Sequence, residues 1–214
     1  MSETIVDRMR AAAGDLWGRA MTHASAGSEH NQRLEFLGNA VLNLAIADHV
    51  HEHCSEREGR LTVMTNFLRS DRVLSEVGMR IEIEKELKLG NGVEVKAASS
   101  ILAGAVEAAI GAVFERNGYE AARSFVEEMV LTPDLLQRAE EHQDPVTELK
   151  ELVEAKRWKP ASRGFDEMLG EKRVFYRAIE LNGKAVLGMG SSKRAAEAQA
   201  ARLMLSAMND GGAV

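Results

Sequence analysis

The placement of proline constrains what this chain can fold into more than any other sequence feature. Its 214 residues contain three prolines, and two of them, Pro133 and Pro145, bracket one short stretch at 132–144. Because proline interrupts a helix interior, the long proline-free run before this stretch is free to be helical. The placement predicts one domain at 1–140 and a second domain at 144–210, with a short boundary segment between them.

Helical spacing of apolar residues supports this interpretation for the first domain. Two stretches repeat apolar residues every three or four positions, the period of one helix face, and both are rich in alanine and glycine, which suits close helix packing. The recurring positions are Leu34, Leu37, Val41, Leu44 and Ala45, and then Ile101, Ala105, Ala108, Ala109 and Ala112. We expect an all-helical domain, in which the apolar face after Asn39 lies either in the core or in a dimer interface.

After the boundary, the order of signals is helix, strands, helix. Asp144 followed by Pro145 is typical of a helix start, Asn182-Gly183 of a tight hairpin turn, and Ser192 of a helix cap. The expected strands lie at 161–168, 175–181 and 185–187, and the expected last helix lies at 193–208. The whole chain is therefore predicted to be α+β, an all-helical domain followed by a small α-β-β-β-α domain.

Composition excludes several classes of protein. With 45% hydrophobic and 28% charged residues the chain can bury a core, which excludes disordered and fibrous proteins. No apolar run approaches the roughly 18 residues that span a bilayer, and the first residues lack the layout of a secretory signal. The single cysteine, Cys54, cannot form a disulfide framework. We expect a cytoplasmic protein without a membrane segment.

Charge is divided unevenly between the two domains. Residues 1–143 carry 15 Lys and Arg against 23 Asp and Glu, whereas residues 144–214 carry 12 against 10. An acidic chain of net charge −6 argues against a protein that coats nucleic acid nonspecifically. A local basic face in the second domain is compatible with these numbers.

One string in the first domain carries a family signature. Residues 30–42 read HNQRLEFLGNAVL, which resembles the ribonuclease III signature NERLEFLGD(S/A)VL. The strings THAS at 22–25, EGRLT at 58–62 and EAAIGAVF at 107–114 follow in the order typical of that family. The resemblance extends over nearly the full chain.

This resemblance implies a helical endonuclease domain that dimerises and cuts both strands of duplex RNA. In the family, four carboxylates hold Mg²⁺, a hard cation that activates water and stabilises charge on the attacked phosphate. Matched position by position, those ligands fall on Glu35, Asn39, Gly104 and Glu107. Only two of the four are carboxylates in this chain, and Gln32 replaces a further glutamate of the signature.

Two missing anionic ligands predict a protein that is inactive or strongly impaired as a nuclease. Under this interpretation Glu35 and Glu107 are remnants, partly buried carboxylates that serve packing or hydrogen bonding. The alternative is an active Mg²⁺-dependent endoribonuclease of RNA processing, which uses Glu35, Glu107 and Glu58 or a partner subunit's carboxylates. A third hypothesis is a scaffold role in a ribonucleoprotein without appreciable affinity for free RNA.

The second domain resembles a double-stranded RNA-binding domain. Residues 188–201, GMGSSKRAAEAQAA, are similar to its motif GxGxSKKxAExxAA. Ser192 at a helix start, with Lys193 and Arg194 beside it, favours a row of phosphates as ligand. The alternative is a capped surface helix with two exposed cations. By the same resemblance, Thr147 and Glu151 on the first helix meet 2′-hydroxyls in a minor groove, or else belong to an ordinary solvated face.

The loop between the first two strands departs from this motif. The family form contains Gly-Pro-x-His, whereas residues 170–173 read GEKR. The loop before Phe175 is about two residues shorter than in the family. Lys172 and Arg173 are candidates to contact phosphate in place of the missing histidine. The partners implied are double-stranded RNA, a second copy of the chain in a homodimer, and an active homologue in a heterodimer.

Overall fold

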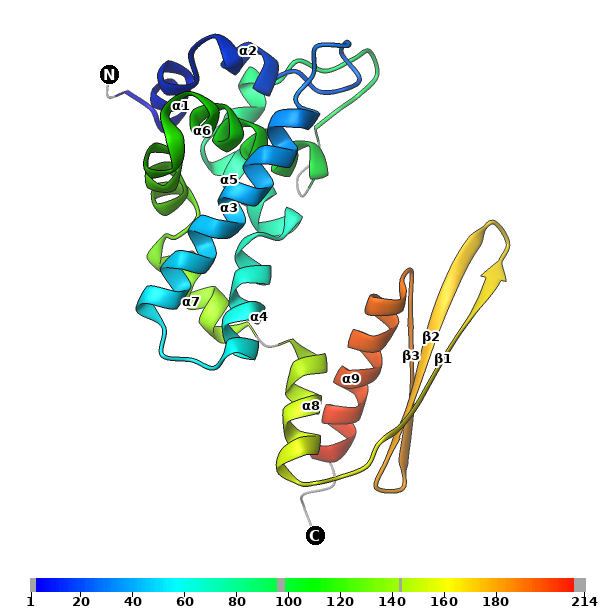
Figure 1. Cartoon of the computed structure of the whole chain (residues 1–214). Coiled ribbons are helices and arrows are strands. Elements are labelled where there is room, and N and C mark those ends of the chain that lie inside the picture. Colours follow the sequence, from blue (N-terminus) through cyan, green and yellow to red (C-terminus); the bar gives the residue numbers. More distant parts are fainter. Residues whose placement is uncertain (1–2, 96–98, 143, 210–214) are drawn as a thin grey trace. The chain divides into compact units, whose positions relative to one another are not determined.

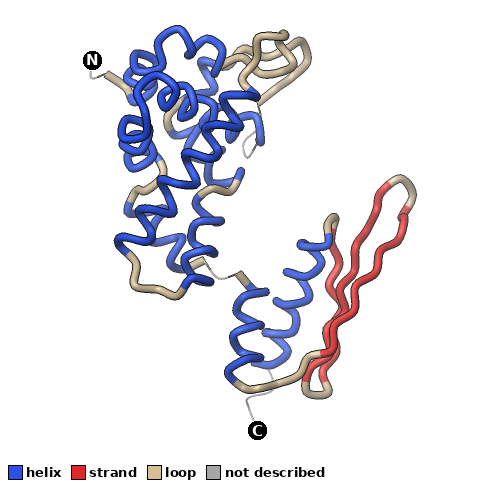
Figure 2. The backbone as a smooth tube through the Cα atoms, viewed as in Figure 1, coloured by secondary structure: helices blue, strands red, loops and turns tan. Residues whose placement is uncertain are grey.

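The computed structural model describes residues 3–95, 99–142 and 144–209 (Figure 1). It divides the chain into two compact units, Met1–His142 and Gln143–Val214. The first unit is built from helices, and the second combines two helices with an antiparallel sheet (Figure 2). The predicted α+β fold, an all-helical domain followed by a small α-β-β-β-α domain, is confirmed.

Helices of very different length make up the first unit. The α-helices are α1 (Ile5–Ala13), α2 (Trp17–Ala20), α3 (Gln32–His53), α4 (Glu58–Leu68), α5 (Asp71–Arg80), α6 (Ser100–Met129) and α7 (Pro133–Glu141), and short 3-10 turns lie at Gly14–Leu16 and Ile83–Glu86. Side-chain caps start several of them, as at Thr4, Ser70, Ser99 and Thr132. Such caps satisfy amide groups that the first turn of a helix leaves unpaired.

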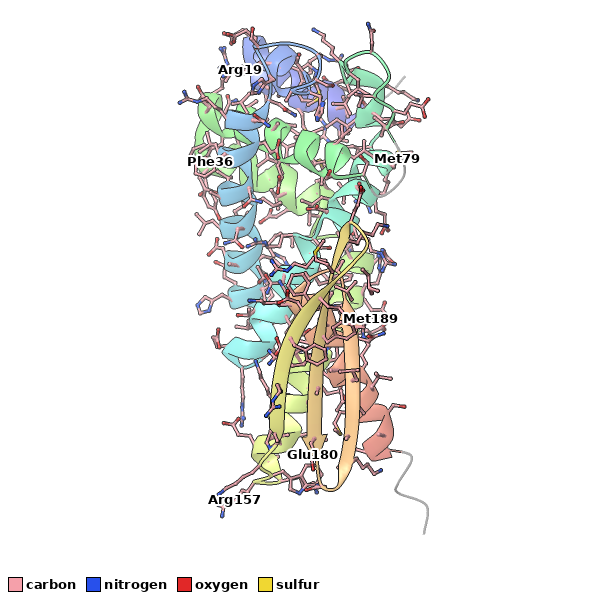
Figure 3. All side chains as sticks on the ribbon, turned by 90° about the vertical axis from the view of Figure 1, so that its right-hand side faces the viewer. Arg19, Phe36, Met79, Arg157, Glu180 and Met189 are labelled. Carbon is pink, nitrogen blue, oxygen red and sulfur yellow. The ribbon has the colours of Figure 1, made fainter. Side chains whose placement is uncertain are left out.

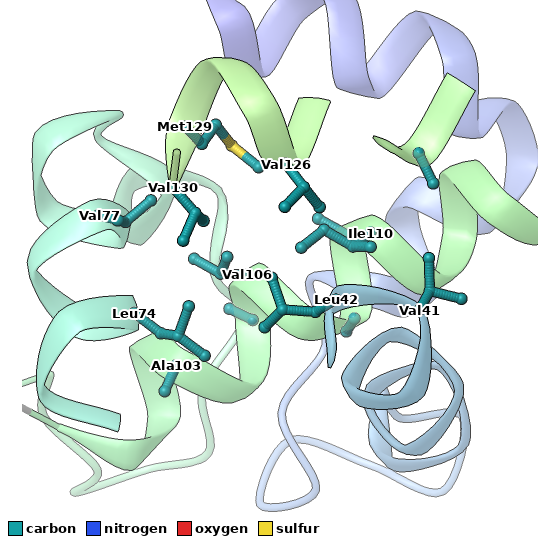
Figure 4. Close-up of a cluster of buried hydrophobic side chains, with 14 of the residues drawn as sticks. Val41, Leu42, Leu74, Val77, Ala103, Val106, Ile110, Val126, Met129 and Val130 are labelled. Carbon is teal, nitrogen blue, oxygen red and sulfur yellow. The ribbon is translucent and has the colours of Figure 1, made fainter. Parts of the chain in front are cut away.

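The two longest helices, α3 and α6, pack against each other through glycine. A Cβ atom at Gly38 would lie 1.7 Å from the carbonyl oxygen of Glu107, and one at Gly111 would lie 2.2 Å from that of Leu34. Only residues without a side chain permit this contact between backbones. Around it, apolar side chains of α3, α5 and α6 form the core, including Leu42, Leu74, Val106, Ile110 and Val126 (Figure 4).

The apolar face expected after Asn39 divides between core and solvent. Val41, Leu42 and Ala45 are buried. Leu44 is 55% exposed, although its spacing placed it with them, and Phe36 is 81% exposed. Helix α3 therefore presents an apolar stripe outward as well as inward.

The second unit consists of α8 (Pro145–Ala155), β1 (Ala161–Leu169), β2 (Lys172–Leu181), β3 (Lys184–Gly190) and α9 (Lys193–Asn209). The strands form an antiparallel sheet in the order β1-β2-β3. Both helices cover one face of this sheet, where Leu149, Ile179, Leu181, Ala200 and Met204 are the centre of a small core. The strands are longer than the alternating patterns predicted, because β2 already begins at Lys172 and β3 continues through Gly188 and Gly190.

Those two glycines bring β3 against α9. A Cβ atom at Gly188 would lie 2.3 Å from the carbonyl oxygen of Ala196 and from the amide nitrogen of Ala200. The low strand propensity of glycine hides this segment from sequence patterns. Close backbone contact then decides its structure. Within the described residues, no helix is long and apolar enough to cross a membrane.

Candidate functional site

Packing of α3 against α6 brings together the four positions matched to metal ligands. Glu35 lies in the first turn of α3 and Asn39 one turn later, while Gly104 and Glu107 lie one turn apart on α6. Residues three or four apart share a helix face. The contact through Gly38, described above, holds the two faces together.

Asn39 and Glu107 form a direct hydrogen bond across these helices. The Nδ2 atom of Asn39 donates to Oε1 of Glu107 over 2.5 Å, and Glu107 is only 8% exposed. Burial raises the pKa of Glu107; the Asn39 hydrogen bond opposes this rise and the charge of Glu35 adds to it. One carboxylate of the site is therefore bonded to a neutral amide instead of to a cation.

Glu35 faces the position that has lost its side chain. A Cβ atom at Gly104 would lie 3.0 Å from Cδ and Oε2 of Glu35. Burial raises the pKa of Glu35, His23 opposes this rise, and Asp71 adds to it. A cavity of about 140 Å³ opens beside this carboxylate; its lining includes His23, Asn31, Gln32, Ser100 and Gly104.

These residues do not fit the Mg²⁺ centre that the family implies. In the chain as described, with its gaps at 96–98 and 143, no group of three or more His, Cys, Asp or Glu residues is arranged to hold a metal ion. Mg²⁺ needs near-octahedral oxygen ligands and gains affinity from anionic charge. Asn39 presents its amide nitrogen to Glu107, and Gly104 presents no ligand atom.

Asp71 is an acidic neighbour that the sequence did not reveal. It begins α5 behind the cap residue Ser70, and its charge raises the pKa of both Glu35 and Glu107. An aspartate in this position is typical of any helix start, so no sequence signal marked it. Glu58, considered above as an auxiliary ligand, begins α4 and accepts a hydrogen bond from Thr62.

The second unit presents its candidate phosphate-binding residues at the start of α9. The Ser192 hydroxyl accepts a hydrogen bond of 3.1 Å from the amide of Ala195 and so caps the helix. Lys193 and Arg194 follow, and both are exposed. Neither forms an ion pair with another described residue. A helix start with two exposed cations attracts anions.

Lys172 and Arg173 lie in a strand instead of the expected loop. Strands β1 and β2 pair as far as Leu169 and Lys172, which leaves only Gly170 and Glu171 in the turn. Arg173 forms an ion pair of 2.7 Å with Asp166 and lies over the ring of Phe175. The charge of Arg173 is therefore partly compensated, whereas Lys172 is exposed beside the turn between β1 and β2.

Thr147 and Glu151 lie one turn apart on α8. The hydroxyl of Thr147 donates a hydrogen bond of 2.9 Å to the cap residue Asp144, so this side chain helps to start the helix. Glu151 is exposed. Both are on one helix face, and Thr147 has a structural role besides any contact with RNA.

Histidines at the end of α3 form a stack that the sequence analysis did not predict. The rings of His49 and His53 lie 4.3 Å apart at an interplanar angle of 21°. Burial and the neighbouring His53 lower the pKa of His49. The two residues are four positions apart, so they share a helix face although His51 between them does not.

Together the two units define a protein of two-domain architecture, in which a helical domain of the nuclease type precedes an α-β-β-β-α domain. The chain belongs to the ribonuclease III family. The sequence model of the Ribonuclease-III-like family matches residues 14–134. The protein named Ribonuclease 3 from Vibrio cholerae is 35% identical over 92% of each chain. That from Carboxydothermus hydrogenoformans is 36% identical over 89% of this chain and 85% of its own.

Solved structures are similar to the helical unit. The nuclease domain of ribonuclease III from Campylobacter jejuni has a TM-score of 0.52 at 27% identity and covers 59% of this chain and 99% of its own. A second structure of that domain, at 2.2 Å resolution, has a TM-score of 0.51 at 26% identity and covers 65% and 98%. The name of the first structure describes flexibility in a region involved in dimer formation.

Proposed function

We propose that this protein binds double-stranded RNA in the cytoplasm and cleaves it weakly or not at all. The observation that carries this proposal is the hydrogen bond from Asn39 to Glu107. It engages the more buried of the two remaining carboxylates with a neutral amide, while Gly104 supplies no ligand atom. A site of this kind lacks the anionic charge that holds Mg²⁺ and stabilises the attacked phosphate.

RNA binding is supported by the start of α9. Ser192, Lys193 and Arg194 combine a capped helix start with two exposed cations, which suits phosphates along a groove of duplex RNA. Thr147, Glu151 and Lys172 are proposed to extend the contact, and Arg173 contributes less because of its ion pair with Asp166. Family membership supports the same substrate class.

An active Mg²⁺-dependent endoribonuclease is the second candidate function. It is supported by the relatives named Ribonuclease 3, which match almost the whole chain, and by the presence of both Glu35 and Glu107 on facing helices. In this case Mg²⁺ would be bound by those two glutamates with water in the remaining positions.

We further propose that the helical unit dimerises through the exposed side of α3. Phe36 and Leu44 lie two turns apart and are both solvent-exposed, which is unusual for large apolar side chains on one face. Pairing with a second copy gives a homodimer without a complete metal site. Pairing with an active homologue gives a heterodimer in which only that homologue holds metal.

Cleavage and binding must be measured separately on one preparation. Long duplex RNA is incubated with the full chain and Mg²⁺ or Mn²⁺, with Vibrio cholerae Ribonuclease 3 as the matched enzyme. We expect retarded RNA on native gels and intact RNA on denaturing gels. Robust conversion into short duplexes would refute the impaired-nuclease proposal in favour of the second candidate. Absence of any RNA binding would support the scaffold hypothesis.

A further inference from the structure

The sheet of the second unit has an apolar face that neither α8 nor α9 covers. Ile179 and Leu181 of β2 are buried under the helices, so the alternate positions of that strand point the other way. Cross-strand register extends this face over all three strands. We call the apolar residues in the middle of this face the open-face patch: Phe165, Val174, Tyr176, Ala178, Leu187 and Met189.

The patch is contiguous because its residues are direct neighbours in the sheet. Tyr176 pairs with Phe165 on one side and Met189 on the other, and Ala178 pairs with Leu187. The rings of Phe165 and Tyr176 stack with centroids 4.9 Å apart. Phe165, Leu187 and Met189 are each about half exposed. Figure 3 looks onto this side of the sheet, with Met189 labelled near its middle.

A sheet face exposed to water normally carries polar side chains in these positions. Contiguous apolar surface of this kind marks an interaction site. The charges that surround the patch indicate its partner.

Charged residues flank the aromatic pair in a symmetric pattern. On β1, Arg163 lies two positions before Phe165 and Glu167 two positions after it. Because strand positions alternate, all three share the open face. Arg163 forms no ion pair with any residue in the described ranges, and Glu167 accepts a hydrogen bond of 2.6 Å from Tyr176.

Strand β2 also carries one cation and one acid on the open face. The cation of β2 lies at the end of the sheet where β1 carries its acid. On β2, Lys172 lies four positions before Tyr176 and Glu180 lies four positions after it, so both are on the open face and both are exposed. Antiparallel pairing therefore places one cation and one acid at each end of the patch.

Two such faces are complementary when related by a two-fold axis that lies in the interface and crosses the strands. The axis reverses the strand direction. The residue two positions after Phe165 on one β1 therefore meets the residue two positions before Phe165 on the β1 of the other copy. Arg163 then opposes the partner's Glu167, and Lys172 opposes the partner's Glu180. The aromatic pair meets its own copy at the axis, as isologous contacts require. Two aligned sheets pack face to face in this way in β-sandwiches.

We propose that the open-face patch binds the open-face patch of a second copy of this chain. The contact is distinct from the proposed α3 dimer and from the phosphate-binding residues of α9, which lie on the helix side of the unit. It would link two dimers, or join the second units within one dimer, where tethering raises their effective concentration. Glu167 and Glu180 argue against RNA on this face, because phosphates would approach two carboxylates.

A charge-reversal cycle on the full chain tests the proposal. Sedimentation velocity is run on the natural chain and in a Phe36→Asp background that removes the proposed α3 contact. We expect concentration-dependent dimers in that background, weakened about ten-fold by Arg163→Glu and by Phe165→Ser. The swap Arg163→Glu with Glu167→Arg restores opposite charges across the axis and recovers association. Arg202→Glu, an exposed reversal on α9, is the matched control and leaves it unchanged.

Association that is equal in Arg163→Glu and Arg202→Glu, or no association at all, overturns the proposal. If the natural chain and the Phe36→Asp chain associate equally, the proposed α3 contact has failed, and the patch is still judged by its own variants. A second test mixes two Cys54→Ser chains, one with Arg163→Cys and the other with Glu167→Cys. Opposed residues of two packed sheets lie about 10 Å apart, beyond the reach of a disulfide, so a short bismaleimide is the cross-linker. A covalent dimer of the two chains supports the patch and its absence refutes it. RNA binding that Phe165→Ser abolishes assigns the face to RNA instead.

Discussion

The carboxylate of Glu35 lies against the position where a side chain at Gly104 would begin. The distance from a Cβ atom at that position to Cδ of Glu35 would be 3.0 Å. An aspartate there requires Glu35 to shift, and it adds negative charge to a site that already holds Glu35, Glu107 and Asp71. The loss of one ligand and the present position of Glu35 are therefore coupled.

Restoring the two lost carboxylates is expected to recover a metal response. Gly104→Asp alone lowers the free energy of unfolding in EDTA by about 1–3 kcal/mol, because like charges crowd a partly buried site. Asn39→Asp with Gly104→Asp gains thermal stability when Mg²⁺ or Mn²⁺ is added, since an ion that binds only the folded state stabilises it. Differential scanning calorimetry measures both effects.

Gly59→Asp is the control for this pair of variants. Gly59 is a helical glycine with open space around its Cβ position, so an aspartate there adds charge without a ligand set. An equal metal response in Gly59→Asp and in the double variant would mean that the restored positions do not bind the ion.

Glu107→Gln is expected to change the pH dependence of stability. Because burial raises the pKa of Glu107, the folded state binds its proton more tightly than the unfolded state. The natural chain therefore loses stability as the pH rises above the ordinary glutamate range. The glutamine accepts the Asn39 hydrogen bond without charge, so the variant is more stable at pH 8 by on the order of 1 kcal/mol. Urea unfolding at pH 5 and pH 8 should show the difference shrinking at the lower pH.

Removal of the cations that begin α9 is expected to weaken RNA binding. Lys193→Ala and Arg194→Ala should each reduce affinity for duplex RNA several-fold and lower the slope of log K against log salt by about 1. Arg202→Ala, which removes an exposed cation from the same helix, should have little effect. Fluorescence anisotropy at several salt concentrations measures both quantities; equal losses in all three variants contradict the assignment.

Asp166→Asn is expected to strengthen binding of duplex RNA. The substitution removes the carboxylate that pairs with Arg173 over 2.7 Å and frees the guanidinium for phosphate. We expect a several-fold higher affinity with a steeper salt dependence. Glu171→Gln removes the same charge from the adjacent turn without releasing Arg173. If both variants strengthen binding equally, net charge and not the released arginine is responsible.

Phe36→Asp is expected to disrupt the proposed dimer of the helical unit. Phe36 is 81% exposed, so a charge is tolerated in a monomer but not in an apolar interface. Light scattering should report a smaller species than the natural chain, with unchanged helix content by circular dichroism. Met79→Asp, which places the same charge at an exposed apolar residue of α5, tests whether the effect is confined to the apolar stripe of α3.

Much of the site was predictable because its residues lie in contiguous strings. The signature at 30–42 located Glu35 and Asn39, and the cap at Ser192 located the start of α9. Asp71 and the hydrogen bond from Asn39 to Glu107 were not predictable, because they depend on contacts between residues more than 30 positions apart. The strand position of Lys172 and Arg173 was also missed, since their pairing partners on β1 have no regular alternation.

The two-domain α+β organisation follows from proline placement, helical periodicity and the Asn182-Gly183 turn. These are local signals, because a cap, a turn or a helix face is defined within a few residues. Which carboxylates lie close together depends on how α3, α5 and α6 pack. In the folded chain Asn39 donates a hydrogen bond to Glu107, and Glu35 lies beside Gly104, which has no side chain. The open-face patch likewise forms only when the three strands pair. Burial and pairing depend on residues that are close in space but far apart in the sequence, so no local pattern along the chain shows them.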